Sequence, residues 1–335
     1  MPTFTGWAAA KPGEPLRPHS YDPGPMKPDD VELEVLSCGV CHSDLSIINN
    51  DWGVSGYPVI PGHEVVGRVA ARGDAVEHLD VGDVVGLGWF SRSDLVCPHC
   101  MRGDHNLCPS NEQTIVGRHG GFADRVRCQA AWAVKVPDGV DAAKAGPLFC
   151  GGITVFNPIV QLGVRPTDRV AVVGIGGLGH LALQFLRAWG CHVTALTSTD
   201  AKADEAKALG AHEVINSRDT AQLERAAGAF DFILVTVNVP LEWGSYIASL
   251  APRGRLHFVG AVLEPIELEA FALILGQRSV SGTPLGSPAT SAVMLDFCAR
   301  HGIAPVTETF PMDRANDAIE HLRAGNARYR VVLTN

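Results

Sequence analysis

The feature that most constrains this chain is a glycine-rich segment between an expected strand and an expected helix. Gly174-Ile175-Gly176-Gly177-Leu178-Gly179 follows the apolar run 170–173 and opens a helix-like stretch that reaches Trp189. In this setting glycines let the backbone turn tightly and approach a pyrophosphate, whose charge faces the free N–H groups of the helix start. The string alone is also compatible with a plain tight turn, but its strand-loop-helix context predicts a dinucleotide-binding site.

The rhythm of the chain changes at about residue 150. Before it, β-rich runs broken by Gly and Pro indicate an irregular all-β domain; they cover residues 31–37, 64–71, 81–87, 122–126 and 133–136. After it, strands (169–173, 192–196, 213–216, 231–237, 255–259) alternate with helices (178–189, 202–209, 241–250). This alternation predicts an α/β fold class, with a doubly wound parallel sheet beside the β-rich part. Two later helices (289–300, 313–322) and a strand (329–333) are expected either to extend that sheet or to pack on the first domain.

The end of the second strand in this alternation indicates which nicotinamide cofactor binds. An Asp or Glu there holds the ribose 2'-hydroxyl of NAD, but this strand ends in Leu196-Thr197-Ser198-Thr199, followed by Asp200 and Lys202. Hydroxyls and a lysine suit a 2'-phosphate, so NADP(H) is expected in preference to NAD(H). A longer strand would bring Asp200 to the ribose, and residues 198–200 also have the composition of a helix cap.

Bulk composition limits the architecture and the partners. With 335 residues, 46% of them hydrophobic and 19% charged, the chain exceeds one compact core, so two domains are expected. The N-terminal residues lack a basic start followed by an apolar stretch, and no run approaches the roughly 20 apolar residues of a membrane helix, so neither secretion nor a membrane partner is expected. A net charge of −9 without clustered Lys and Arg argues against nucleic acid and favours a small-molecule substrate.

Cysteine usage points to metal chemistry. Nine cysteines are an odd number in a chain without a secretory signal, which predicts thiols and metal sites in a reducing cytoplasm. Three segments supply candidate ligands for a catalytic zinc: Cys38-Gly-Val-Cys41-His42-Ser43-Asp44, Pro61-Gly62-His63-Glu64 and Phe149-Cys150-Gly151-Gly152. A Cys/His/Cys set leaves one position open on the ion, which then acts as a Lewis acid. A lone Cys or His is more often a packing or turn residue, so only the combination is informative.

Several motifs together resemble a known family. CGVCHSDL, PGHEVVGRV, FCGGITVFNP, VVGIGGLGH and RYRVVL stand in the order found in zinc-containing medium-chain alcohol dehydrogenases. CHSDL, PGHE, AKALGA and LDFCARHGI are similar to the cinnamyl alcohol dehydrogenase branch and its bacterial aldehyde reductase relatives. The resemblance implies a GroES-like catalytic domain (1–150 and 290–335), a Rossmann domain (151–289) and a homodimer formed through the edges of the Rossmann sheets.

The resemblance also implies roles for individual residues. Cys41, His63 and Cys150 would hold the catalytic zinc, Glu64 would approach the metal during ligand exchange, and Asp44 would orient His63. Ser43 would hydrogen-bond the substrate oxygen and pass its proton on. His42 would lie near the cofactor pyrophosphate and Thr154 near the nicotinamide. The family uses only the second cysteine of Cys38-x-x-Cys41, so Cys38 is expected to be a packed strand-end residue.

Two positions depart from the family pattern. The family's structural-zinc lobe has four cysteines, and this chain keeps Cys97, Cys100 and Cys108 but has Asp94 in the first place. Zinc accepts a carboxylate oxygen, so an Asp/Cys3 site is expected; an empty lobe, or substitution by His99, Asp104 or His105, is the alternative. Ser46 stands where members of the branch commonly carry histidine, which leaves the outer part of the proton path open.

The function expected from these features is hydride transfer between NADPH and an aldehyde. The substrate class would be aromatic or medium-chain aldehydes and primary alcohols, with Trp52, Trp89 and Phe90 as candidate lining of an apolar pocket. The alternatives are an NAD-dependent secondary-alcohol or polyol dehydrogenase, and a non-catalytic cofactor-binding protein on the same scaffold.

Overall fold

The computed structural model describes residues 3–335, which divide into two compact units. The β-rich unit runs to Ile153 and resumes over Gly286–Asn335, and the parallel-sheet unit is Thr154–Leu285. The sequence placed the corresponding changes at about residues 150 and 290.

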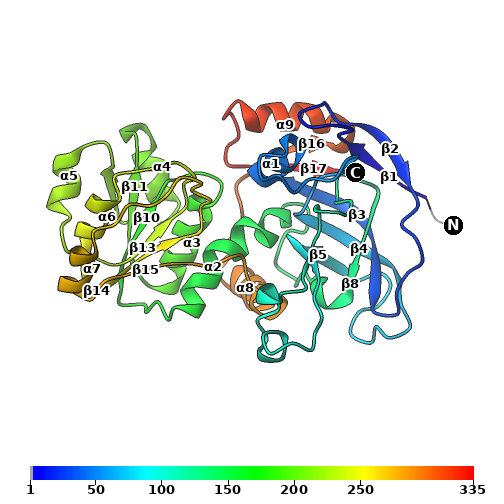
Figure 1. The fold of residues 1–335 in the computed structure, drawn as a ribbon, viewed down its shortest axis with the longest axis horizontal. Coiled ribbons are helices and arrows are strands. Elements are labelled where there is room, and N and C mark those ends of the chain that lie inside the picture. The colour runs from blue at the N-terminus through cyan, green and yellow to red at the C-terminus, as the bar shows by residue number, and fades with distance from the viewer. Residues whose placement is uncertain (1–2) are drawn as a thin grey trace. The chain divides into compact units, whose positions relative to one another are not determined.

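The parallel-sheet unit has six strands in the order β12-β11-β10-β13-β14-β15, all parallel (Figure 1). Their bounds are β10 Arg169–Val173, β11 His192–Thr197, β12 Glu213–Asn216, β13 Phe230–Val235, β14 Leu250–Phe258 and β15 Ser279–Gly282. The order reverses between β10 and β13, and a sheet of this kind binds ligands at such a switch point, beyond the carboxyl ends of the strands. The predicted α/β fold class is therefore confirmed.

One helix precedes β10, and the other helices and a 3-10 turn lie in the connections between these strands. They are α2 Gly151–Gln161, α3 Gly179–Trp189, the 3-10 turn η5 Asp200–Lys202, α4 Ala203–Ala208, α5 Thr220–Arg225, α6 Trp243–Ser249 and α7 Ala270–Gly276. The apolar face of α3 packs on β10 and β11, and its side chains Leu181, Leu183 and Leu186 are fully buried. Strand β10 is buried from Val170 onward because it lies in the middle of the sheet.

The β-rich unit is built on one sheet in the order β16-β17-β3-β4-β5-β9, with β8 also paired to β3. Two antiparallel pairs, β1-β2 and β6-β7, form separate two-stranded sheets in this unit. The strands are β1 Phe4–Ala8, β2 Arg17–Tyr21, β3 Asp30–Val40, β4 Val65–Arg72, β5 Val84–Leu87, β6 Phe90–Arg92, β7 Glu112–Gln113, β8 Arg125–Gln129, β9 Val134–Lys135, β16 Thr307–Pro311 and β17 Arg330–Thr334. Its helices are α1 His42–Asn49, α8 Pro288–His301 and α9 Ala315–Arg323, with 3-10 turns η1 Cys100–Arg102, η2 His105–Leu107, η3 Ala130–Trp132, η4 Gly146–Phe149 and η6 Met312–Arg314.

The C-terminal segment belongs to the β-rich unit, which decides between the two alternatives left by the sequence. Strand β17 runs antiparallel to β3, with Leu333 opposite Cys38. The two ends of the chain are tied again by Asn335, whose side-chain amide donates to the carbonyls of Val35 and Ala123. The last strand thus completes the sheet that carries the first candidate ligands.

Several strand boundaries differ from the sequence prediction by a few residues; the strand expected over 81–87 begins at Val84, and the one expected over 255–259 begins at Leu250. The strand expected over 122–126 begins instead at Arg125, because the preceding residues serve another purpose. Phe122 is fully buried and its carbonyl accepts from the Trp7 amide. Among residues 3–335, no helix combines the length and the apolar character needed to cross a membrane, and all nine cysteines are free.

Candidate metal centres and cofactor site

Cys41 lies at the start of α1, where the local sequence forms a capping box. Cys41 is the N-cap residue, and the Asp44 side chain three residues later accepts from the Cys41 backbone N–H at 2.9 Å. This reciprocal arrangement satisfies backbone donors that a helix start otherwise leaves free. It fixes the Cys41 thiol at the junction between β3 and α1.

The imidazole of His63 is oriented by the same carboxylate. Nδ1 of His63 lies 3.0 Å from Oδ1 of Asp44, and both side chains are fully buried. Because a carboxylate only accepts, Nδ1 carries the proton and Nε2 is left with its lone pair. Asp44 Oδ1 also accepts from the Gly62 amide at 2.8 Å, so the carboxylate fixes the turn that presents His63.

Cys41, His63, Glu64 and Cys150 form a group whose ligand atoms all lie within 4.8 Å of one another. Nε2 of His63 is 3.3 Å from the Cys150 sulfur. The hydrogen bond from Cys150, followed by the charges of Arg330 and His63, lowers the pKa of Cys41 well below its usual range, and the same pairing raises the pKa of Cys150. Two sulfurs and an imidazole nitrogen converging at this spacing have the donor chemistry of a zinc site.

Glu64 pairs with Arg330, a residue that the sequence analysis did not single out. Its carboxylate is fully buried and forms a short ion pair with Arg330, which is itself only 6% exposed. Burial raises the pKa of Glu64, although the charge of Arg330 opposes that shift. The other oxygen, Oε2, is buried and has no hydrogen-bond partner within residues 3–335. Buried polar atoms are normally paired, so an unpaired oxygen beside these ligands fits a bound metal ion. Arg330 stands in the motif RYRVVL, where an arginine inside an apolar strand was the available sign.

The remaining predicted residues of this region are placed as follows. The Ser43 hydroxyl lies 3.8 Å from the Cys41 sulfur, beside the candidate ligands. Ser46 is half-buried on α1, while His42 is exposed at the start of that helix. Cys38 is fully buried, lies outside the ligand group and has a pKa raised by burial, as expected of a packed strand residue. Thr154 is buried on α2, in the parallel-sheet unit.

Two of the three predicted aromatic residues lie next to the ligand group. The Trp89 ring meets His63 edge to face at 5.1 Å, and Trp52 meets Trp89 at 5.8 Å. The expectation for Phe90 was wrong: it is buried and packs on Trp132 at 5.4 Å. Trp89 lies in the bend before β6, whose first residue is Phe90, and the two rings contact different partners.

A second group brings together Asp94, Cys97, Cys100 and Cys108, again with ligand atoms within 4.8 Å. Asp94 Oδ1 accepts from the amides of Val96 and Cys97, which fixes the carboxylate in place of the missing cysteine. The sulfurs accept backbone N–H groups: Cys97 from the Cys100 amide at 3.4 Å and Cys108 from the Asp94 amide at 3.5 Å.

The nearby substitutes considered for this lobe do not join the group. His99 bonds to Arg102, Asp104 lies 4.0 Å from the same arginine, and His105 bonds to the Gly103 carbonyl. The donor set of this lobe is therefore one carboxylate and three thiols.

The glycine-rich loop has the backbone that pyrophosphate binding requires. Gly174 has φ +87°, which side-chain-bearing residues rarely adopt. A Cβ on Gly179 would lie 1.9 Å from the Gly174 carbonyl, so only glycine allows α3 to start this close to β10. Nothing lies within 4 Å of where a Gly176 Cβ would be, which leaves its backbone open to a ligand. Gly177 and Leu178 complete the loop, and Leu178 is the N-cap of α3.

The tip of β11 presents the hydroxyls and the lysine that the sequence indicated. Thr197 ends the strand and is buried, whereas Ser198 is exposed. Thr199 caps η5, accepting from the Ala201 amide. The Lys202 ammonium donates to the Ile175 carbonyl at 3.3 Å, so it lies against the glycine-rich loop.

Asp200 does not extend β11, so the carboxylate is not at the strand tip. It lies in η5, and its Oδ1 accepts from the Asn216 side-chain amide at 3.2 Å. Asn216 ends the neighbouring strand β12. This hydrogen bond holds the Asp200 carboxylate on the β12 side.

Comparison with known proteins gives consistent matches over the whole chain. Residues 27–138 match the alcohol dehydrogenase GroES-like domain family, and residues 177–300 match the zinc-binding dehydrogenase family. The aldehyde reductase AdhA of Synechocystis sp. is 57% identical over 98% of both chains. A cinnamyl alcohol dehydrogenase structure from Sorghum bicolor superposes with a TM-score of 0.95 at 39% identity, covering 99% of this chain and 98% of that one.

A second solved structure bears on the cofactor. The cinnamyl alcohol dehydrogenase from Helicobacter pylori, complexed with NADP(H), superposes with a TM-score of 0.90 at 28% identity. The match covers 99% of this chain and 98% of that one.

Replacing Asp44 by asparagine tests the role of its carboxylate. Asn has one acceptor oxygen instead of two, so it cannot keep all three hydrogen bonds, and we expect zinc affinity at the first site to fall about 10- to 100-fold. Chelator competition measures this loss. The matched control is Asp51→Asn, an exposed carboxylate beyond α1; equal zinc affinity in both variants would contradict the assignment.

Proposed function

Because the chain belongs to the zinc-binding alcohol dehydrogenases with a GroES-like domain, we propose that it is an NADP(H)-dependent aldehyde reductase that interconverts aldehydes and primary alcohols. The observation that carries this proposal is the convergence of Cys41, His63 and Cys150, with the buried, unpartnered Glu64 oxygen beside them. The name of the 57% identical relative, an aldehyde reductase, supports the same direction of reaction.

Each residue of the first centre has a physical role in this proposal. Cys41, His63 and Cys150 would hold the zinc, which when bound supplies a Lewis acid that polarises a carbonyl oxygen. Asp44 keeps the Nε2 lone pair of His63 available. Arg330 pairs with one oxygen of Glu64, which leaves the other oxygen at the ligand group, where it would be able to approach a bound metal.

Proton transfer is assigned to Ser43. Its hydroxyl lies beside the Cys41 sulfur, so a substrate oxygen at the centre is within reach of a hydroxyl that can donate. His42 near the pyrophosphate and Thr154 near the nicotinamide remain proposals that rest on the family pattern. Ser46 cannot act as a base near neutral pH, so the outer proton acceptor is water in this proposal.

Three features of the parallel-sheet unit support NADP(H) over NAD(H). The glycine-rich loop is open at Gly176, the exposed Ser198 and the Lys202 ammonium offer donors beside it, and Asp200 is held by Asn216. A 2'-phosphate gains charge-assisted hydrogen bonds from such donors and is repelled by a carboxylate. Structural similarity to a cinnamyl alcohol dehydrogenase complexed with NADP(H) adds support.

The aromatic pair supports an aromatic or medium-chain apolar substrate. Trp52 and Trp89 are half-buried, and Trp89 contacts the His63 ring. Indole faces bind aromatic and aliphatic groups through area burial and ring contact.

The central experiment measures zinc content together with reduction of an aldehyde panel by NADPH and NADH. We expect NADPH to be preferred, and Lys202→Ala to raise the KM for NADPH about tenfold while leaving that for NADH nearly unchanged, since one charge-assisted contact is lost. The matched control is Lys207→Ala, an exposed lysine on α4. Equal use of both cofactors by the wild type would overturn the NADP assignment, and activity that survives complete zinc removal would overturn the zinc assignment.

A second zinc in the Asp94 lobe is also proposed. Three thiols and a carboxylate at this spacing form a four-ligand set, which is typical of a structural zinc site. The lobe otherwise has little apolar burial to fix it, since Val96 and Met101 are 76% and 74% exposed. Metal ligation would therefore supply the folding energy of this segment.

Substitution of Asp94 separates metal ligation from local capping. Asp94→Asn can still accept the two backbone N–H groups but loses the anionic oxygen, so we expect zinc content to fall from two to about one per chain. Asp94→Cys should retain two. Metal analysis by mass spectrometry measures both, with Asp104→Asn as the control in the same loop; a wild type that binds a single zinc would refute the second site.

We further propose a homodimer through the β15 edge of the parallel sheet, and a cytoplasmic location in line with nine free thiols. β15 ends the sheet order, so one side of it has no partner strand within residues 3–335. Next to it in sequence, α7 exposes Phe271 (67%), Ile274 (67%) and Leu275 (74%). A sheet edge with an apolar patch is the kind of surface that pairs with a second copy.

Leu275→Asp tests this surface. A buried charge at an apolar interface is costly, so we expect the variant to elute as a monomer at micromolar concentration while the wild type is a dimer. Size-exclusion chromatography with light scattering measures the mass. Val81→Asp, at a 64% exposed position in the other unit, should remain dimeric; a dimeric Leu275→Asp variant would rule out this interface.

A further inference from the structure

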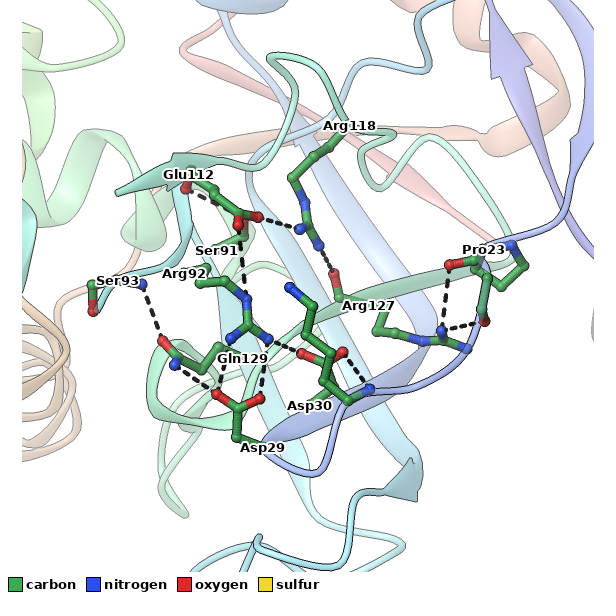
Figure 2. Close-up of polar contacts among 12 residues, drawn as sticks. Pro23, Asp29, Asp30, Ser91, Arg92, Ser93, Glu112, Arg118, Arg127 and Gln129 are labelled. Carbon is green, nitrogen blue, oxygen red and sulfur yellow. Dashed lines mark hydrogen bonds and ion pairs between the residues drawn. The ribbon is translucent and has the colours of Figure 1, made fainter. Parts of the chain in front are cut away.

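The β-rich unit contains a surface pocket that none of the residues of the two metal groups lines. Its volume is about 350 Å³, within the range of small-molecule sites. Residues of β2, of the segment that follows it, of β6 and of β8 form its walls. Figure 2 shows the polar contacts around it.

Cationic side chains outnumber carboxylates in the lining. Lys27, Arg92, Arg118 and Arg127 line the pocket, against Asp22 and Asp30. The excess is confined to the lining, because Asp29, Glu112 and Glu32 pair with the arginines from outside it. The carboxylates are also engaged: Asp30 pairs with Arg92 and accepts from the Lys27 amide, and Asp22 accepts from the Gly24 amide.

The guanidinium groups are held in place largely by carboxylates that do not line the pocket. Asp29 takes two hydrogen bonds from Arg92, Glu112 pairs with Arg118, and Glu32 pairs with Arg127 (Figure 2 shows the first two). Arg118 also donates to the Arg127 carbonyl at 2.8 Å. Side chains fixed in this way lose little further entropy when a ligand binds.

Two further donors at the pocket have no protein partner. Within residues 3–335, neither the exposed Lys27 ammonium nor the Tyr21 hydroxyl makes a hydrogen bond. Burial raises the pKa of Tyr21, so its phenol stays protonated and can donate. Tyr21 packs on His119, with ring centroids 4.3 Å apart.

His119 supplies one more donor. Burial, and then the charge of His19, lowers the pKa of His119, so the ring is neutral near pH 7. Its Nδ1 lies 3.4 Å from the Ile60 amide and accepts from it, which leaves the proton on Nε2. Lys27, Tyr21 and His119 therefore each present a donor hydrogen at the pocket.

We infer that this pocket is a binding site for a compact oxyanion, a phosphate or carboxylate group of a small molecule, held by Lys27, Tyr21 and Arg118. Guanidinium and ammonium groups recognise such oxygens by charge-assisted hydrogen bonds. The volume admits a ligand of metabolite size. Binding would connect the segment after β2 to Arg118 and, through it, to the Glu112 end of β7 and to β8, and so stabilise the β-rich unit in proportion to ligand occupancy.

The test is isothermal titration of the zinc-loaded enzyme saturated with NADP⁺, using inorganic phosphate in one arm and citrate in the other at constant ionic strength. Saturating NADP⁺ occupies the site for the 2'-phosphate, so the added anion cannot bind there. We expect binding of at least one of the two anions, weakened about tenfold by Lys27→Gln, which removes the charge of the donor, and several-fold by Tyr21→Phe, which removes the hydroxyl. Neither side chain has a protein hydrogen bond to lose, so both variants should keep the wild-type unfolding temperature.

Two control variants show whether anion binding depends on this pocket. Lys144→Gln removes a surface charge in the same unit outside the pocket and should leave affinity unchanged. Lys202→Ala affects the cofactor site alone and should also leave it unchanged. The proposal would be overturned if neither anion gave a heat of binding at concentrations up to about 10 mM, on the order of the weakest useful affinity. Binding that survives Lys27→Gln and Tyr21→Phe but disappears in Lys202→Ala would also overturn it.

Discussion

The Asp44 carboxylate accepts three hydrogen bonds, from the Cys41 amide, the Gly62 amide and the His63 imidazole. These donors come from three places: the start of α1, the turn before β4, and a ligand side chain. Because the carboxylate is fully buried, each bond is stronger than it would be in water, and each would be costly to leave unmade. One side chain thus fixes the backbone beneath two ligands and the tautomer of one of them.

The second constraint comes from the far end of the chain. Strand β17 pairs with β3, which places Arg330 against Glu64 in the interior. A buried carboxylate without an ionic partner would be protonated or would destabilise the fold. The charge of Arg330 therefore allows Glu64 to stay ionised beside the ligand group. The C-terminal strand is therefore part of the centre, although the three ligands lie within the first 150 residues.

The sequence predicted the features that depend on neighbouring residues. The capping-box spacing of Cys41 and Asp44 and the glycines at 174, 176 and 179 each follow from local backbone geometry. Features set by distant pairing were missed or misplaced. The role of Arg330 depends on a contact across 266 residues, and the direction of Phe90 depends on which face of β6 meets Trp132. Neither the Arg330–Glu64 contact nor the Phe90–Trp132 contact can be predicted from neighbouring residues, because both depend on tertiary packing.

The ion-pair cluster around Arg92 shows how local charge and the metal lobe are related. Arg92 comes two residues before Asp94, and Glu112 comes four residues after Cys108, so the cluster holds both ends of the lobe. Gln129 reinforces it, accepting from the Ser93 amide and donating to Asp29. Largely buried guanidiniums need such carboxylates to offset desolvation, and here most of those carboxylates lie outside the pocket. The same pairing that anchors the lobe thus leaves a cation-rich surface facing the pocket, so anchoring of the lobe and affinity for an oxyanion share one set of arginines.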